Sequence, residues 1–184
     1  MARMDAIELL AHDHRMVEQL FRDYHAAASA EQRRGVVQIT VRELSKHAAL
    51  EELMVYPLAR KVLPDGAREI DEHLAEHRDV KKTLAALDTM PAGDERMDSL
   101  MAELRREVAE HVREEEGELL PKLRGALDQQ ALDELGEALD KAKRTAPTRP
   151  HPRAPDRPPG LTFAGPVAAI YDRLRDRLQG RPQT

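Results

Sequence analysis

The sequence contains no cysteine and no tryptophan, and aromatic residues account for only 3% of its 184 positions. Without cysteine a disulfide framework is excluded and no thiolate can bind a metal, so any metal site must rely on nitrogen and oxygen ligands. The lack of cysteine also agrees with a reducing cytoplasm, which is the location that we expect. The shortage of aromatic residues, beside abundant Ala, Leu, Glu and Arg, argues against a β-sandwich and favours solvent-exposed helices.

Long apolar runs and an excess of positive charge are absent as well. No stretch approaches the roughly 18 to 20 apolar residues of a membrane-spanning helix, and the N-terminal segment MARMDAIELL lacks the apolar core of a signal peptide. The formal net charge of −5 is opposite in sign to the usual footprint of a nucleic-acid-binding protein. We therefore expect neither a membrane nor a nucleic acid as a partner.

The sequence is rich in helical periodicity. Apolar residues recur at steps of three and four, the spacing of a helix with one buried face, and they predict helices over about 4–28, 31–63, 67–89 and 94–121. Turn signals at Pro64–Gly66 and Pro91–Gly93 separate these segments, and Asp94 is placed to cap the fourth helix. Ile39 is expected on the inner face of the second helix. Pro57 is expected to kink that helix or to restart its last turns.

These segments predict an all-α fold, an up-and-down antiparallel four-helix bundle with extra C-terminal helices and a Pro/Arg-rich linker. A short amphipathic helix, DQQALDELGEALDKAKR, completes a predicted domain over residues 1–144. Residues 145–164 are rich in Pro and Arg and predict a flexible linker. Residues 165–184 resume helical spacing, and this terminal helix would either fold back on the bundle or mediate self-association or contact with a protein partner.

An internal repeat divides the bundle into two halves. The pattern H-x3-E-E-x4-P occurs twice, 64 residues apart, starting at His47 and at His111. The helix before each copy carries [DE]-H-R-x-V, starting at Asp13 and at Glu76, which are 63 residues apart. Two αα-hairpins of one design pack as an antiparallel bundle related by a pseudo-twofold axis. That axis would bring the polar residues of both halves together at the centre.

The repeated residues have the chemistry of a metal site. Residues i and i+4 of a helix lie about 40° apart around the axis and one turn apart along it, so each H-x3-E pair points two ligands toward one place. Two carboxylates buried without partners would be costly, so a cation should lie among them. The candidate ligands that the two halves share are His14, His47, Glu51, His77, His111 and Glu115.

This ordered series resembles the hemerythrin-like family of HHE cation-binding domains, whose motif order is H, H-x3-E, H, H-x3-E on four successive helices. His14, His47–Glu51, His77 and His111–Glu115 fill that order, and the resemblance covers about residues 4–144. It implies a non-haem di-iron centre with two iron ions, bridged by the two glutamates and by an oxo or hydroxo group, with histidines completing the coordination. Imidazole-rich ligation suits iron, although zinc or manganese could occupy such a site.

His73 departs from the symmetry of the repeat, because its counterpart in the first half is Leu10. It lies one turn before His77, as in the oxygen-carrying hemerythrins, whose third helix offers H-x3-H, and it is included among the predicted metal ligands. A role in the core or in support of a ligand stays open. If His73 binds, one iron is nearly saturated by protein and the other keeps an open position. Tyr56 is placed either to contact the site or to pack at the helix kink.

Other interpretations use some of the same residues. His73–His77 reads HLAEH, which matches the H-x2-E-H zinc site of some metallopeptidases, but a peptidase site leaves the repeated H-x3-E pairs unexplained. His12 and His25 are predicted to face away from the centre. The sequence contains no Gly-rich phosphate loop and no nucleophile elbow that would indicate another enzyme.

The resemblance favours a protein that binds or turns over a small ligand, namely O2, NO or H2O2. The sequence leaves open whether it is an oxygen- or NO-binding carrier, a sensor, or an oxidoreductase with catalase-like or NO-reactive activity. A further alternative is a metal-dependent sensing or interaction module that signals through the C-terminal tail.

Overall fold

The structure, a computed structural model, describes residues 4–152, which form helices joined by short turns and contain no strand. In chain order these are α1 (Ala6–Ala26), α2 (Ala30–Leu50), η1 (Glu51–Val55), α3 (Tyr56–Val62), α4 (Gly66–Asp88), α5 (Met97–Glu114), η2 (Glu115–Leu119), α6 (Leu120–Ala126) and α7 (Gln129–Lys143). The two η elements are single π-helical turns that connect α-helices end to end. The predicted all-α fold is confirmed.

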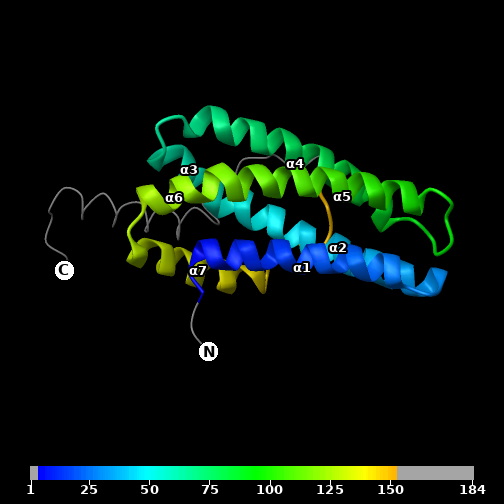
Figure 1. The fold of residues 1–184 in the computed structure, drawn as a ribbon. Helices are drawn as coiled ribbons and strands as arrows, with labels where there is room; N and C mark the ends of the chain where they lie inside the picture. Colours follow the sequence, from blue (N-terminus) through cyan, green and yellow to red (C-terminus); the bar gives the residue numbers. More distant parts are fainter. Residues whose placement is uncertain (1–3, 153–184) are drawn as a thin grey trace, which may run out of the picture.

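The helices form four long rods, namely α1, α2–η1–α3, α4 and α5–η2–α6, and the shorter α7 lies at the side of the bundle (Figure 1). The first hairpin packs α1 against α2, which continues through η1 and α3, and the second packs α4 against α5, which continues through η2 and α6. The two hairpins meet mainly where α2 and α3 contact α4, and α7 lies along α1. The predicted linker over 145–164 continues beyond residue 152, and the predicted terminal helix lies wholly outside the described residues.

The helix starts follow the local sequence. Asp5 caps α1 with a reciprocal capping box, in which the Asp5 side chain accepts from the Glu8 backbone N–H and Glu8 accepts from the Asp5 backbone N–H. The expected cap of α5 by Asp94 is wrong. Asp94 instead accepts from the backbone N–H of Arg96, two residues on, because Gly93 takes a left-handed turn with φ of 81° and the helix begins only at Met97.

Each of the two Pro-containing rods contains a π-turn that ends two residues before its proline. Proline lacks an N–H and clashes with the carbonyl four residues earlier, and a π-turn accommodates this by inserting one extra residue into the helix. The backbone N–H of Tyr56 accordingly bonds to the carbonyl of Glu51, and the N–H of Leu120 bonds to that of Glu115. The disturbance expected at Pro57 thus begins at the glutamate of the H-x3-E pair.

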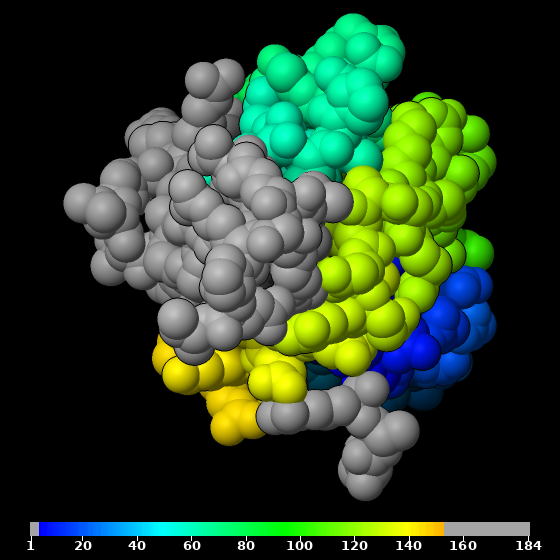
Figure 2. All heavy atoms as spheres, turned by 90° about the vertical axis from the view of Figure 1, so that its left-hand side faces the viewer, coloured from blue at the N-terminus to red at the C-terminus, as the bar shows by residue number. Residues whose placement is uncertain are grey.

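The core consists of two apolar clusters. One cluster fills the end of the bundle that contains α3, α6 and α7, and Figure 2 views the molecule from that end. The other fills the end near the α1–α2 and α4–α5 turns, where Phe21, Leu84 and Leu104 pack together. Along α1, Leu10 belongs to the first cluster and Val17 to the second. The residues between them therefore lie at the boundary of the two clusters.

Ile39 does not face the core, contrary to the sequence prediction, because its side chain is 40% exposed. The buried face of α2 instead runs through Val37, Thr40, Val41 and Leu44. Thr40 can be buried because its hydroxyl donates to the carbonyl of Val36 in the preceding turn.

Candidate metal centre

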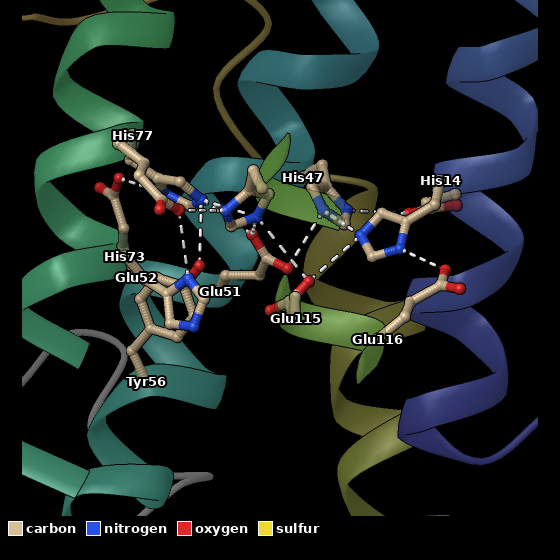
Figure 3. Close-up of polar contacts among 12 residues, drawn as sticks. His14, His47, Glu51, Glu52, Tyr56, His73, His77, Glu115 and Glu116 are labelled. Atoms are coloured by element: carbon tan, nitrogen blue, oxygen red, sulfur yellow. Dashed lines mark hydrogen bonds and ion pairs between the residues drawn. The ribbon is translucent and has the colours of Figure 1, made fainter. Parts of the chain in front are cut away.

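A layer of histidine and glutamate side chains crosses the bundle between the two apolar clusters (Figure 3). The four long rods each contribute one imidazole from the repeat, and all four are at least 93% buried: His14, His47, His77 and His111. Glu51 and Glu115 begin the two π-turns and are fully buried. The structure therefore brings together the six residues that the two halves share.

The four imidazoles are arranged as two close pairs. The Nε2 atoms of His14 and His47 are 3.1 Å apart, and those of His77 and His111 are 3.4 Å apart. Each pair joins neighbouring rods, α1 with α2 or α4 with α5. Two basic nitrogens directed at one point are the arrangement expected of ligands that share a cation.

The two glutamates extend between the histidine pairs. Glu51 places one oxygen 3.1 Å from Nε2 of His47 and the other 3.2 Å from Nε2 of His77. Glu115 lies 3.2 Å from Nε2 of His14 and 3.8 Å from Nε2 of His111. Each carboxylate thus contacts both pairs, as a ligand that bridges two ions would.

The carboxylate oxygens of this layer lack ordinary hydrogen-bond partners. Both oxygens of Glu51 and both of Glu115 are buried without a hydrogen bond to any described residue. Buried polar atoms in native proteins are nearly always satisfied, and an unpaired buried carboxylate is especially costly. Two groups of ligand atoms lie within 4.8 Å of one another and could hold an ion, namely His14, His47, Glu51, Glu115 and, beside it, Glu51, His77, His111.

The buried carboxylates of the layer favour the protonated, positively charged form of two of its histidines. Burial by itself would lower the pKa of His47, but the charge of Glu51 and the contact with Asp13 raise it to about 10. Burial would likewise lower the pKa of His77, but its contacts with Glu51 and Glu52 raise that pKa to about 9. Burial acts to raise the pKa of Glu51, but His47 and His77 hold it well below its ordinary value. In the metal-free protein these imidazolium groups supply the positive charge that the buried carboxylates require.

The outward-facing Nδ1 atom of each histidine meets a second carboxylate, and these four acids follow the repeat. Glu116 lies 2.7 Å from Nδ1 of His14, and its repeat partner Glu52 lies 3.0 Å from Nδ1 of His77. The acids that precede the first histidine of each half, Asp13 and Glu76, face the histidine of the next rod. A carboxylate at Nδ1 fixes the tautomer that leaves Nε2 free for a metal.

Asp13 faces Nδ1 of His47 at 3.8 Å, which is longer than a hydrogen bond, and Glu76 lies 3.0 Å from Nδ1 of His111. The sequence analysis did not assign these four acids to the site. Their signal was nevertheless present, because the repeat contains an acid before each first histidine and a second glutamate after each H-x3-E pair.

His73 is buried beside the second histidine pair but contacts it differently. Its Nδ1 lies 3.3 Å from Glu76, and its ring packs edge-on against His111 and stacks on Tyr56. Burial would lower the pKa of His73, but the contact with Glu76 raises it. His73, Glu76 and His111 form a third group whose ligand atoms lie within 4.8 Å of one another. The structure does not place His73 in the same group as Glu51 and His77.

The hydroxyl of Tyr56 lies 3.0 Å from Nε2 of His77, and both side chains are buried. Burial and the charges of the surrounding glutamates raise the pKa of Tyr56 well above its ordinary value, so the hydroxyl keeps its proton. Of the two roles predicted for Tyr56, contact with the site is confirmed. His12 and His25 are exposed, as predicted.

Two cavities border the layer. A small apolar cavity of about 20 Å³ lies against all four paired histidines, and Val17, Leu44, Val80 and Val108 form much of its remaining wall. A groove of about 320 Å³ between α1 and α5 reaches His14 and Glu116 from the surface. Of the four outer acids, Glu116 is the most exposed, at 42% of its side chain, whereas Glu52 is 9% exposed. The first histidine pair is therefore the side of the layer nearer to solvent.

Similarity to known proteins identifies the family to which this chain belongs. The family model for the hemerythrin HHE cation-binding domain matches residues 5–123. The chain belongs to the hemerythrin family. It is also 31% identical over 173 residues to an uncharacterized hemerythrin-like protein of Schizosaccharomyces pombe, an alignment that covers 92% of this chain and 84% of that protein. No solved structure matches the chain.

Membership of the hemerythrin family accounts for the arrangement of helices and for the buried histidine and glutamate groups that could hold a metal. The family match ends before α7, so this helix lies outside the matched residues. Within residues 4–152, no helix combines the length and the apolar character that crossing a bilayer requires.

Proposed function

We propose that this hemerythrin-family protein holds two iron ions in the polar layer and uses them to bind or turn over O2, NO or H2O2. The proposed ligands are His14, His47, Glu51, His73, His77, His111 and Glu115. The observation that carries the proposal is that Glu51 and Glu115 each contact both histidine pairs while their oxygens lack hydrogen bonds. A carboxylate placed in this way suits a pair of cations.

Charge balance supports two divalent ions. Among residues 4–152, six carboxylates contact the four paired histidines, and two lysines contact those carboxylates, Lys81 at Glu52 and Lys143 at Asp13. Six negative charges less two positive charges leave four, if the histidines are neutral. Two divalent cations would balance that charge, and the buried pairs would then be fully compensated. When bound, iron would supply the electron transfer that the chemistry of O2, NO and H2O2 requires.

The protein side chains define where a small ligand would enter. The α1–α5 groove leads to His14, and the small apolar cavity lies against all four paired histidines. The second pair lies beside His73 and beside a buried contact between Lys81 and Glu52, 2.6 Å apart. If His73 serves as a fifth imidazole, the second ion has three histidines and the first has two. The open coordination position would then belong to the ion that the groove approaches.

The apolar walls of the small cavity would exclude water and charged solutes from the histidines. Val17, Leu44, Val80 and Val108 carry no group that can donate a proton. A small neutral ligand such as O2 or NO can enter a cavity of this kind without losing hydrogen bonds. Tyr56 brings a protonated hydroxyl to the second histidine pair, where it could donate to a ligand.

Anaerobic loading with Fe2+ tests the proposal. We expect two iron ions per chain, and optical spectra of the reduced protein that change on addition of O2, NO or H2O2. Rapid evolution of O2 from H2O2 would identify a catalase-like enzyme, and a reversible absorption band would identify a carrier or sensor. His47→Gln should lose iron, whereas His12→Gln and His25→Gln, which alter exposed histidines, should not. Only trace iron in the unaltered protein would refute the proposal.

The zinc-peptidase interpretation of HLAEH gains no support from the geometry. That mechanism needs His73 and His77 on one zinc ion and Glu76 free to activate water. In this protein Glu76 contacts His73 and His111, and His77 directs its two nitrogens toward Glu51 and Glu52.

A further inference from the structure

Helix α7 lies outside the family match but is firmly attached to the bundle. It runs along α1 (Figure 1), and Leu132, Leu135 and Leu139 are buried in the apolar cluster at that end. Gly136 allows the close approach, because a Cβ atom there would lie 2.7 Å from the backbone oxygen of Met4. The last turn of α7 thereby reaches the level of the polar layer.

Lys143, the last residue of α7, makes a charge-assisted contact with that layer. Its Nζ donates to Oδ1 of Asp13 over 2.5 Å, across 130 positions of sequence. The Asp13 side chain is 2% exposed, whereas that of Lys143 is 24% exposed. A lysine that extends its stem along the helix surface and places its charge on a buried carboxylate compensates that charge at the edge of the core.

The other oxygen of Asp13 faces His47. Oδ2 lies 3.8 Å from Nδ1 of His47, and neither atom has a hydrogen-bond partner among the described residues. Asp13 is therefore the acceptor available to that nitrogen. His47 must carry its proton on Nδ1 if Nε2 is to bind a metal, so the position of Asp13 bears directly on whether His47 can serve as a ligand.

The second half of the bundle positions its corresponding acid differently. Glu76, the repeat counterpart of Asp13, already lies 3.0 Å from Nδ1 of His111 and also contacts His73. No lysine contact to Glu76 is present among the described residues. The first half has Leu10 where the second has His73, so Asp13 lacks the neighbour that Glu76 has. Lys143 fills that role from a different element.

We propose that α7 contributes to the metal centre through Lys143. This lysine is a positioning residue that holds Asp13 in place to accept from Nδ1 of His47. This inference rests on the proposed metal site. With a metal on Nε2 of His47, removal of Lys143 would leave the Asp13 carboxylate buried without a cationic side chain beside it. The carboxylate would then turn or shift toward water, and His47 would lose the acceptor that fixes its tautomer. Loss of such a partner typically weakens metal binding about 10- to 100-fold.

The test uses Co2+, a probe with visible ligand-field bands, titrated into the full-length metal-free protein. We expect two Co2+ per chain in the unaltered protein. Lys143→Met keeps the apolar stem and removes the charge, and it should weaken one of the two Co2+ affinities about 10-fold or more while sparing the other. Lys141→Met is the matched control, because Lys141 is exposed on the same turn, and it should leave both affinities unchanged. Lys143→Arg should restore most of the loss.

A double-mutant cycle shows whether Lys143 acts through Asp13. Asp13→Ala should weaken the same Co2+ affinity, and Asp13→Ala with Lys143→Met should be no weaker than Asp13→Ala alone, because both changes remove one interaction. Additive losses would overturn the proposal. Urea unfolding of each metal-free variant separates a local effect from general destabilisation: a drop in stability with both affinities intact would make Lys143 merely structural. If the unaltered protein binds no Co2+, the proposed metal site itself fails.

Discussion

The metal-free protein should lose stability as the pH rises from 7 to 9, in contrast to the flat profile of an ordinary helical bundle over this range. The cause is the protonation of two buried histidines, one from each pair. The buried glutamates raise the pKa of His47 from 6.5 to about 10 and that of His77 from 6.5 to about 9. A raised pKa in the folded state contributes stability that is fully present below the unfolded value, near 6.5. That contribution is lost as the pH rises through the folded values.

The magnitude follows from proton linkage. Between the unfolded and the folded pKa, each of these histidines holds a proton that the unfolded chain has released. The free energy of unfolding should therefore fall by about 1.4 kcal/mol per pH unit for each histidine. Glu51 contacts both histidines, so their contributions are not independent. We expect a total loss of about 3 to 5 kcal/mol between pH 7 and pH 9.

Urea unfolding followed by far-UV circular dichroism, in the presence of a chelator, measures this loss at pH 7, 8 and 9. Glu51→Gln removes the charge that sustains both raised pKa values, so that variant should show a shallower slope. In the metal-loaded protein this slope should disappear, because metal replaces the protons on Nε2 and neither the folded nor the unfolded chain then holds them between pH 7 and pH 9. Stability that stays constant or increases with pH in the metal-free protein would refute the electrostatic account of the site.

Three further outcomes follow from the packing. Tyr56→Phe removes the hydroxyl that lies 3.0 Å from Nε2 of His77, and it should change the optical spectrum of the iron-loaded protein while two ions per chain remain bound. Gly136→Ala should lower the free energy of unfolding by about 1 to 3 kcal/mol because its Cβ meets backbone, whereas Gly125→Ala, with nothing within 4 Å, should be neutral or stabilising in the same urea titration. Leu104→Ala leaves a cavity at a fully buried core position and should lower the free energy of unfolding by about 2 to 5 kcal/mol without changing the iron content. A loss of iron from this variant would show that the apolar clusters do not act independently of the polar layer.

The sequence predicts the bundle and the inner residues of the site well because both depend on short-range periodicity. A helix places His47 above Glu51 whatever surrounds it, and the repeat places His111 above Glu115 in the same way. The repeat further predicts that the two halves meet about a shared axis. The structure confirms that these side chains converge, at distances that no single H-x3-E pair could predict.

Features that depend on tertiary contacts could not be predicted from sequence patterns. Pro57 indicates a disturbance, but only the packed rod shows that it is a π-turn beginning at Glu51. Ile39 was assigned to the core because it is apolar, whereas Thr40 occupies that position after satisfying its own hydroxyl. The contact of Lys143 with the polar layer joins distant segments, and no local spacing predicts it.

We expect the polar layer to hold two metal ions between Glu51 and Glu115. Crystals of the anaerobically iron-loaded protein, measured at the iron absorption edge, test this expectation most directly. Two anomalous peaks should appear about 3.5 to 4 Å apart, one beside His14 and His47 and the other beside His77 and His111. A single peak, or iron bound only outside this layer, would show that the layer does not hold a pair of metal ions.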